Sequence, residues 1–235
     1  MQLVTPGVYT LTGLIIGRVF LIVEDDGLTL IDTSMAFAVN RIVNQITAAG
    51  HTLTDLKRIL ITHGHIDHIG GLPRLKALTG ARVIVPAGDR ALIEAGQPAP
   101  APAQETLPGI WRVVPVPPLR CPPAPVDQVV EEGDVLDVLG GLHVLHVPGH
   151  TPGHAAYWQP ERRVLFCGDV IMRFGGPNLR LPFAAATPDM AEDIRSVGKL
   201  AALEPDVLCM GHGQPIAGGA APAVRAFAQQ IGALS

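Results

Sequence analysis

The chain has 235 residues, of which 48% are hydrophobic and 16% are charged, and its formal net charge at pH 7 is −4. This composition excludes a disordered chain, and an acidic balance without a lysine or arginine run excludes a basic surface for nucleic acid or anionic membranes. The most apolar early region, residues 14–32, is interrupted by Arg18 and by acidic residues at 24–26, so no membrane span is predicted. We expect a single domain over residues 1–235 that acts on a small-molecule substrate.

The amino terminus and the cysteines indicate the compartment. MQLVTPGVYT lacks the basic flank and continuous apolar stretch of a secretory signal, which predicts a cytoplasmic protein. Cys121, Cys167 and Cys209 are an odd number without a C-x-x-C pair, so neither a disulfide framework nor a thiolate zinc site is indicated. Cys167 and Cys209 lie in apolar runs, which favours core residues over nucleophiles.

Strands and helices are predicted in the first third of the chain from apolar periodicity and from glycine and proline. Pro73 stands near the start of one helix, where a missing N–H is tolerated, and Gly80 near its end. Strands are predicted at 8–11, 18–25, 28–32, 58–62 and 82–86, and helices at 37–49, from about 73 to 80, and at 89–95.

Proline recurs every few residues between 97 and 125, which disfavours a regular helix or central strand there. One interpretation is a rigid surface connection. The other is one wall of the substrate cleft, with Trp111 and Leu119 as apolar contacts, because long irregular loops in compact domains often serve binding.

Strands return after this segment. A hairpin around Gly140 and Gly141 is predicted in residues 135–149, followed by strands at 154–158, 162–169 and 206–213 and helices at 188–203 and from about 221. Each half thus supplies strands and then helices, which predicts two sheets packed together with helices outside.

The stretch ITHGHIDHIGGL at 61–72 places His63, His65, Asp67 and His68 within six positions. A single histidine is commonly satisfied by a backbone carbonyl or by water. Here the cluster follows a short β-branched run that resembles a buried strand, and the carboxyl end of a strand is where α/β proteins usually bind ligands. Several imidazoles held together would repel one another when protonated, so the cluster indicates a metal ion.

Three later apolar runs each end in a candidate ligand beside glycine: His150, Asp169 and His212. Each alone would be an ordinary loop or turn residue. Glycine lets the backbone turn sharply and approach an ion closely. Together with the first cluster they make seven ligands, whereas a tetrahedral zinc site takes four including water. Two ions that share one carboxylate would use all seven.

These motifs resemble the metallo-β-lactamase-fold hydrolases, and within them the glyoxalase II-like and lactonase-like branch. THGHIDHIGG matches the H-x-H-x-D-H signature, and PGHTPGH, CGD and GHG match the later motifs in order, so the resemblance extends from about Leu30 to Gly213. It implies an α+β fold, a four-layer αββα sandwich of two mixed sheets with helices outside, and a binuclear site at the sheet edge. By position, His63, His65 and His150 would hold one metal, Asp67, His68 and His212 the other, and Asp169 would bridge them.

Two further residues match the family pattern. Asp32, at a predicted strand end, resembles a carboxylate that orients a ligand histidine, and a helix N-cap is its alternative role. His154 in PGHTPGH is expected to support the site and not to coordinate.

Differences between this sequence and particular relatives narrow the expected class of substrate. The β-lactam-hydrolysing enzymes generally lack the bridging aspartate, so Asp169 disfavours antibiotic hydrolysis. The glyoxalase II enzymes carry a further helical domain that binds glutathione, whereas this chain ends soon after His212. Glutathione thioesters are therefore disfavoured as substrates. The acyl-homoserine lactonases have a tyrosine after the bridging aspartate, but Tyr9 and Tyr157 both precede it.

The resulting prediction is a metal-dependent hydrolase in which a hydroxide bridging two divalent ions cleaves a small-molecule ester, thioester or lactone. Asp67 would also orient the hydroxide and pass its proton to the leaving group. Zinc is the default metal, with iron, manganese or cobalt as alternatives. A homodimer is plausible from the apolar composition.

Three other functions are less well supported by the sequence. A persulfide dioxygenase-like oxidoreductase with a single iron is the main alternative, and Asp169 with a complete second ligand group disfavours it. A tRNA-processing nuclease is disfavoured by the acidic balance, and a non-catalytic binding protein by the intact ligand set.

The loop 170–187 begins at the predicted site and should form part of the cleft. Met172, Phe174 and Phe183 would make an apolar pocket or pack in the core, and Arg173 or Arg180 would meet a substrate carboxylate or remain solvated.

Overall fold

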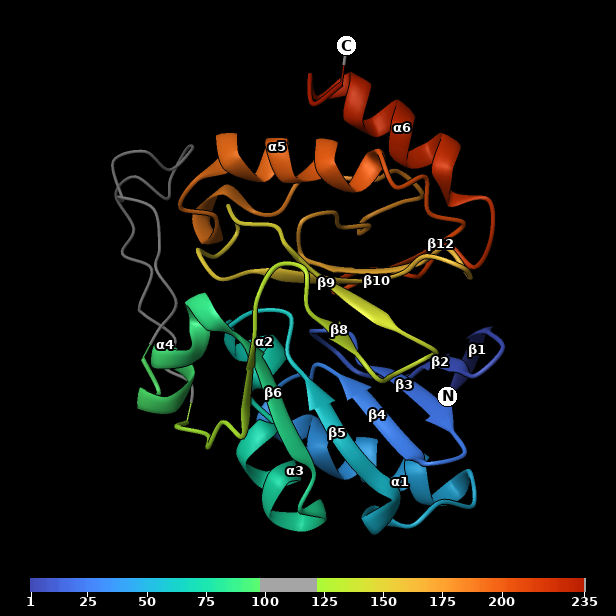
Figure 1. Ribbon diagram of the computed structural model, residues 1–235, viewed down its shortest axis with the longest axis vertical. Coiled ribbons are helices and arrows are strands. Elements are labelled where there is room, and N and C mark those ends of the chain that lie inside the picture. Colours follow the sequence, from blue (N-terminus) through green and yellow to red (C-terminus); the bar gives the residue numbers. More distant parts are fainter. Residues whose placement is uncertain (98–121, 235) are drawn as a thin grey trace.

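The computed structural model describes residues 1–97 and 122–234. Two β-sheets face each other, and helices cover the outer face of each, which gives the predicted four layers (Figure 1). Trp111, Leu119 and Cys121 lie outside the described residues, so the two interpretations of the proline-rich segment stay open. In the described part of the chain, no helix combines the length and apolar composition needed to span a bilayer.

The first sheet is mixed and has seven strands in sequence order. Its first four strands pair antiparallel, and each later strand pairs parallel with its predecessor. The strands are β1 (Gln2–Thr5), β2 (Val8–Thr10), β3 (Phe20–Glu24), β4 (Gly27–Ile31), β5 (Leu56–Leu60), β6 (Arg82–Pro86) and β7 (Gln128–Val130). Its helices are α1 (Val39–Ala48), α2 (Ile66–Ile69), α3 (Leu72–Thr79) and α4 (Arg90–Ala95).

The second sheet has five strands in the order β12-β11-β10-β9-β8. Only β11 and β12 pair in parallel. The strands are β8 (Val135–Leu136), β9 (Leu142–His146), β10 (Ala155–Gln159), β11 (Val164–Gly168) and β12 (Val207–Met210), and the helices α5 (Met190–Ala201) and α6 (Ala220–Gln230) lie outside them.

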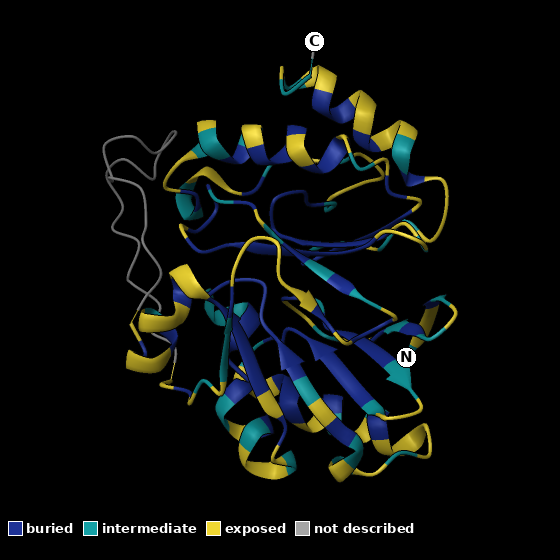
Figure 2. Ribbon diagram, viewed as in Figure 1, coloured by how far each residue is buried: buried dark blue, intermediate teal, exposed yellow. Residues whose placement is uncertain are grey.

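Alternation along the strands separates the core into layers, because successive side chains point to opposite faces. On β3, Leu21 packs in the cluster below the first sheet, whereas Phe20 and Ile22 pack between the sheets. The rings of Phe20 and Phe166 meet edge to face across the two sheets, with centroids 5.5 Å apart. A third cluster lies under α5 and α6. The strands are accordingly buried along most of their length (Figure 2).

Three short elements escape the periodicity of the sequence. The strands β1 and β7 have four and three residues, and their pairing with a neighbouring strand defines them. The helix α2 has four residues directly after His65, within the cluster that follows the predicted strand at 58–62. The predicted hairpin is present as β8 and β9, and its turn residues Gly140 and Gly141 have φ of 78° and 117°, which favour glycine.

The topology brings the predicted ligands to one edge of the sandwich. Parallel strands end at the same edge of a sheet, so Asp32 after β4 lies beside the turn after β5. Asp169 after β11 likewise lies beside the turn after β12. A backbone hydrogen bond joins the two sheets at this edge. The N–H of Ala155 donates to the carbonyl oxygen of Thr62 over 2.8 Å.

Candidate metal centre

Four predicted ligands come from the turn after β5 and from α2. His63 and His65 lie in the turn, and Asp67 and His68 lie on the helix. His65 has extended backbone, with φ −76° and ψ 150°, and the helix begins at the next residue. His63 and His68 are fully buried, so their ring nitrogens need partners other than bulk water.

The other three predicted ligands follow strands of the second sheet. His150 lies in the turn after β9, Asp169 directly follows β11, and His212 comes shortly after β12. The structure brings all seven side chains together. Their ligand atoms form three overlapping groups with separations within 4.8 Å: His63, His65 and His150; His63, His68 and Asp169; and Asp67, His68 and His212.

The first group has the spacing of a metal site. Nδ1 of His65 lies 3.1 Å from Nε2 of His63 and 2.9 Å from Nε2 of His150. A tetrahedral ion with metal–nitrogen distances of about 2.0–2.1 Å separates its ligand atoms by about 3.3 Å. These three imidazoles therefore fit one ion.

The group of Asp67, His68 and His212 also combines a carboxylate with two histidines. Nε2 of His212 lies 3.1 Å from Oδ2 of Asp67. Nε2 of His68 is buried and has no hydrogen-bond partner among the described residues. A buried ring nitrogen without a partner is costly, and coordination of a cation would remove that cost.

Asp169 lies between the group that contains His65 and His150 and the group that contains Asp67 and His212. Its Oδ1 is buried without a hydrogen bond to any residue in the described ranges. A carboxylate in contact with both groups is positioned to serve both. Its Oδ2 is 3.2–3.9 Å from the Nε2 atoms of four histidines, His63, His68, His150 and His212.

Asp32 orients His68. Its Oδ2 lies 2.7 Å from Nδ1 of His68. The same carboxylate accepts from the backbone N–H and from the hydroxyl of Thr62, each over 2.8 Å. The 3₁₀ helix Ala36–Ala38 has Met35 at its N-cap, so Asp32 is not a cap. A proton on Nδ1 of His68 leaves Nε2 free to coordinate.

Threonine hydroxyls contact two further histidines in the same way. Oγ1 of Thr62 lies 3.0 Å from Nδ1 of His63. Oγ1 of Thr187 lies 3.0 Å from Nδ1 of His150 and donates to the carbonyl oxygen of Phe183. Both contacts direct Nε2 of the histidine towards the centre. Thr187 is 37 residues from His150, and nothing in its local sequence signals this role.

For four of the ligands, the electrostatics favour the protonation state that binds a metal. Burial lowers the pKa of His63 well below its usual value and that of His65 to about 3, which keeps both imidazoles neutral. Burial would raise the pKa of Asp67, but His68 and His212 outweigh it and lower the pKa to about 2. The pKa of Asp169 is likewise held well below its usual range.

Two other histidines of the centre, His68 and His212, are drawn towards their protonated forms by neighbouring carboxylates. Burial opposes protonation of His212, but Asp169 and Asp67 outweigh it and raise its pKa to about 9. The pKa of His68 is raised well above its usual value because Asp169 and Asp32 outweigh burial. Buried carboxylates therefore draw protons onto these two imidazoles, and a bound cation would supply the same compensation.

Gly211 leaves room for Asp169. A Cβ at this position would lie 2.0 Å from Oδ1 of Asp169 and 2.6 Å from Cε1 of His68. No side chain larger than hydrogen fits without moving one of these two residues. The expectation that glycine permits close approach is met here by a side chain of the site.

His154 supports the centre from behind. Its Nε2 accepts the backbone N–H of Asp169 over 3.1 Å, and its ring stacks on that of His63 with centroids 4.6 Å apart. It belongs to none of the three ligand groups. This placement agrees with the supporting role expected for it.

Asp89 was missed as a functional residue by the sequence analysis. Its buried carboxylate accepts from the backbone N–H of Gly64 over 2.8 Å, from Oγ1 of Thr151 over 2.8 Å and from the backbone N–H of Gly153 over 2.9 Å. It thereby joins the turn of His63 and His65 to the turn of His150. Its signal in the sequence, an aspartate at a helix start, is that of an ordinary cap.

The loop after Asp169 supplies aromatic rings, but these rings and Met172 are not arranged as one apolar pocket. Met172 is buried in the core, whereas the rings of Phe174 and Phe183 stack with centroids 4.6 Å apart and Phe183 is exposed. The guanidinium of Arg180 lies 5.7 Å from the centroid of Phe174. Nε of Arg173 donates to the carbonyl oxygen of Pro177, so this arginine is engaged within the loop.

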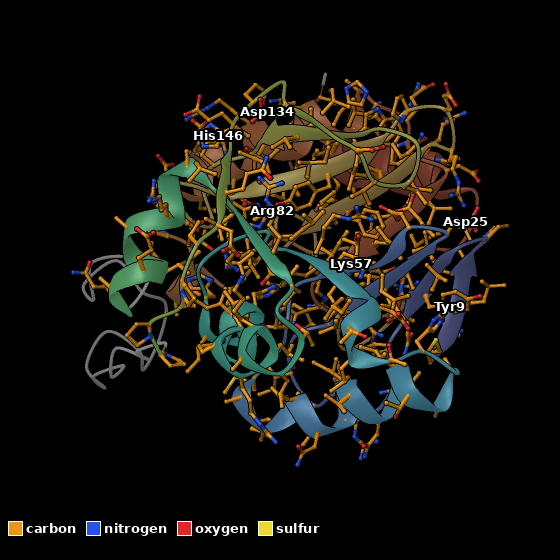
Figure 3. The ribbon with its side chains drawn as sticks, turned by 60° about the horizontal axis from the view of Figure 1, so that its bottom comes forward. Tyr9, Asp25, Lys57, Arg82, Asp134 and His146 are labelled. Atoms are coloured by element: carbon orange, nitrogen blue, oxygen red, sulfur yellow. The ribbon has the colours of Figure 1, made fainter. Side chains whose placement is uncertain are left out.

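Neither tyrosine belongs to the ligand groups. Tyr9 lies on β2 and packs against the cluster below the first sheet (Figure 3). The hydroxyl of Tyr157 is buried and donates to the carbonyl oxygen of Ile61 over 2.7 Å. Cys167 and Cys209 are buried, and burial raises the pKa of both thiols, so neither is a nucleophile.

Known proteins with similar sequences include hydrolases. A hydroxyacylglutathione hydrolase of Pseudomonas aeruginosa (strain LESB58) is 36% identical over 157 residues, which are 66% of this chain and 46% of that protein. The chain thus spans about half the length of the curated relatives of this name. The probable metallo-hydrolase YflN of Bacillus subtilis (strain 168) is 29% identical over 210 residues, 83% of this chain and 78% of that protein.

A solved structure and a family profile extend the similarity over most of the chain. A metallo-beta-lactamase family protein from Thermus thermophilus superposes with a TM-score of 0.72 and 26% identity, and the match covers 98% of this chain and 81% of that one. The profile of the metallo-beta-lactamase superfamily matches residues 12–212, which include every residue of the three ligand groups. The chain belongs to the metallo-beta-lactamase superfamily.

Proposed function

We propose that the protein is a hydrolase that uses two divalent metal ions to cleave an ester, thioester or lactone in a small molecule. The observation that carries this proposal is the position of Asp169. Its Oδ2 lies within 3.9 Å of His63 and His150 on one side and of His68 and His212 on the other. One ion would leave part of this buried set without a partner. Two ions that share Asp169 use it completely.

The chemistry of the ligand atoms indicates which metals could bind. Imidazole and carboxylate donors without thiolate suit zinc, iron or manganese, and zinc is the default. When bound, a pair of such ions lowers the pKa of water towards about 7 and polarises a carbonyl oxygen. One ion would be held by His63, His65 and His150, the other by Asp67, His68 and His212, with Asp169 shared.

Asp67 is the residue proposed to move the proton. Its carboxylate is ionised and only part-buried, and Oδ2 contacts His212 over 3.1 Å. In that state Oδ2 accepts a proton from the attacking water and returns it to the leaving oxygen or sulfur. Both described cysteines are buried with raised pKa values, so neither thiol serves as the nucleophile.

The comparisons support the reaction class. A relative named for hydrolysis of hydroxyacylglutathione supports an acyl ester or thioester as the substrate. A relative named as a probable metallo-hydrolase supports the same general chemistry across more of the chain.

Metal analysis combined with hydrolysis assays tests the proposal. Protein purified without added metal should contain about two zinc, iron or manganese ions per chain by mass spectrometry, and it should hydrolyse one class among lactones, thioesters and aryl esters in a chelator-sensitive manner. Asp169→Asn should reduce both metal content and turnover, whereas His51→Ala, a histidine outside the ligand groups, serves as the control. A single iron without hydrolysis would contradict the proposal and favour the persulfide dioxygenase alternative.

A further inference from the structure

A pocket borders the centre on the side of His212. It has a volume of about 190 Å³ and is lined by the loop before β3 and the loop after β12. The backbone N–H of Arg18 donates to the carbonyl oxygen of Gly211 over 2.8 Å and joins these loops. Gly17 lies so close to α2 that a Cβ there would be 1.8 Å from the carbonyl oxygen of Asp67. The pocket therefore adjoins the ligand group that contains Asp67 and His212.

Arg18 is one of the residues that line this pocket, and its guanidinium is only partly satisfied. Nη1 donates to Oγ1 of Thr10 over 2.8 Å. Nε is buried and has no hydrogen-bond partner in residues 1–97 and 122–234. No carboxylate in the same ranges forms an ion pair with Arg18, whereas Arg58 on β5 pairs with Asp26 over 2.7 Å.

An unpaired cation at this depth is unfavourable in the free protein. Burial lowers the pKa of Arg18, and no described carboxylate opposes that shift. Arginine nevertheless stays protonated in proteins, so its charge persists without a counterion. A ligand that brings one negative charge beside this guanidinium would supply the missing counterion.

We propose that Arg18 binds a carboxylate on the leaving group of the substrate, which makes the substrate an ester or thioester of a hydroxy or mercapto acid. This inference rests on the proposed hydrolase function. The leaving group is assigned because the pocket adjoins Asp67, the residue proposed to return the proton to that group. A single guanidinium balances the single charge of a carboxylate, whereas it would leave one charge of a phosphate dianion unbalanced.

Binding of a leaving-group probe tests the inference without turnover. Calorimetry on the metal-loaded protein would compare 3-hydroxybenzoate with its neutral amide, 3-hydroxybenzamide. Wild-type protein should bind the carboxylate about tenfold or more tightly than the amide, since a hydrogen bond to a charged partner is worth that much. Inorganic phosphate is the competing probe, and tighter binding of phosphate than of 3-hydroxybenzoate would overturn the choice of carboxylate.

Variants of Arg18 separate its contribution from that of the metal ions, which also attract carboxylates. Arg18→Gln should remove about tenfold or more of the preference for 3-hydroxybenzoate, and Arg18→Lys should retain part of it, because lysine keeps the charge but loses the planar fork. Arg90→Gln is the matched control, an exposed arginine on α4 paired with Glu94. An unchanged preference in Arg18→Gln would overturn the inference. Should that variant fail to fold, the comparison of Arg18→Lys with wild type gives the same decision.

Hydrolysis of 3-acetoxybenzoate and 3-acetoxybenzamide distinguishes the two proposals. The ratio of kcat/KM for 3-acetoxybenzoate to kcat/KM for 3-acetoxybenzamide should fall about tenfold or more in Arg18→Gln. Turnover of both esters at equal kcat/KM by wild type would contradict the role of Arg18 and leave the hydrolase intact. Arg18-dependent binding without any turnover of esters, thioesters or lactones would contradict the hydrolase and leave the anion site intact.

Discussion

Nδ1 of His68 and Oδ2 of Asp32 lie 2.7 Å apart at the buried end of β4. Asp32 has a left-handed backbone with φ of 61°, a conformation that asparagine also tolerates. In Asp32→Asn the side chain can turn an N–H towards Nδ1 of His68. The proton of the ring would then move to Nε2, the atom that faces the centre, and metal affinity should fall about 10–100-fold.

Metal competition against a chromogenic chelator measures this change, and Asp25→Asn provides the control because Asp25 is an exposed acid in the turn between β3 and β4 (Figure 3). Equal affinity in Asp32→Asn and wild type would show that the contact does not determine the tautomer of His68.

Gly211→Ala should disrupt the centre without straining the backbone, because φ at Gly211 is not in the left-handed region. The added Cβ would lie 2.0 Å from Oδ1 of Asp169. We expect turnover and bound metal to fall about tenfold or more, since a misplacement of about 1 Å can cost 100-fold in rate. Gly218→Ala is the matched control, because the nearest atom to its Cβ is 3.9 Å away. Full activity of Gly211→Ala would show that Asp169 can move without loss.

Asp89→Asn should destabilise the protein, because one amide N–H would face backbone or hydroxyl donors that now meet a carboxylate. The expected loss is about 1.5–3 kcal/mol in the free energy of unfolding, the usual range for hydrogen bonds to a charged group. Thr151→Val removes one donor only and should cost less, about 1 kcal/mol. Urea unfolding with chelator present measures both, and the visible spectrum of cobalt-loaded protein reports whether the two turns have separated. A larger loss in Thr151→Val than in Asp89→Asn would contradict the role of Asp89 as the common acceptor.

Asp193, on α5, makes stability depend on pH. It is fully buried, its oxygens have no hydrogen bond of good geometry among the described residues, and burial together with Asp169 raises its pKa to about 8. In the unfolded chain its pKa is near 3.8. Between these values the folded state holds a proton that the unfolded state has lost, so the contribution of Asp193 to stability falls as pH rises from about 4 to 8, by at most about 1.4 kcal/mol per pH unit.

The neutral isostere Asp193→Asn isolates this contribution. Its free energy of unfolding should match that of wild type near pH 4 and exceed it increasingly towards pH 8, because asparagine carries no charge to bury. Denaturant unfolding of both proteins at several pH values, with chelator present throughout, gives the difference. A difference that stays constant between pH 5 and pH 8 would show that Asp193 is not protonated in the folded protein.

Much of the fold was predictable because its long elements carry their own periodicity. The helix α1 buries Val39, Ile42 and Ile46, which are among the apolar residues that predict it. Gly80 ends α3 in a left-handed conformation with φ of 70°, as its position after the apolar run suggests. The strands β1 and β7 were not predictable, because three or four residues show too little alternation and only a neighbouring strand makes them strands.

The candidate site likewise contains residues that the sequence reveals and residues that it does not. Residues next to strands could be recognised, because the end of an apolar run is a local signal and the parallel topology then brings such ends to one edge. Asp89 and Thr187 could not be recognised, because their partners Thr151 and His150 are 62 and 37 residues away.

The sequence by itself determined which side chains could bind a metal, because imidazole and carboxylate chemistry at strand ends does not depend on the rest of the fold. Only the tertiary structure decided which atoms of those side chains face the centre and which charges remain unpaired. The tautomer of His68 depends on Asp32, and the unsatisfied guanidinium of Arg18 depends on two loops that meet at Gly211. Hydrogen bonds and desolvation act over a few ångströms between groups far apart in the chain, so sheet packing sets them and local pattern does not.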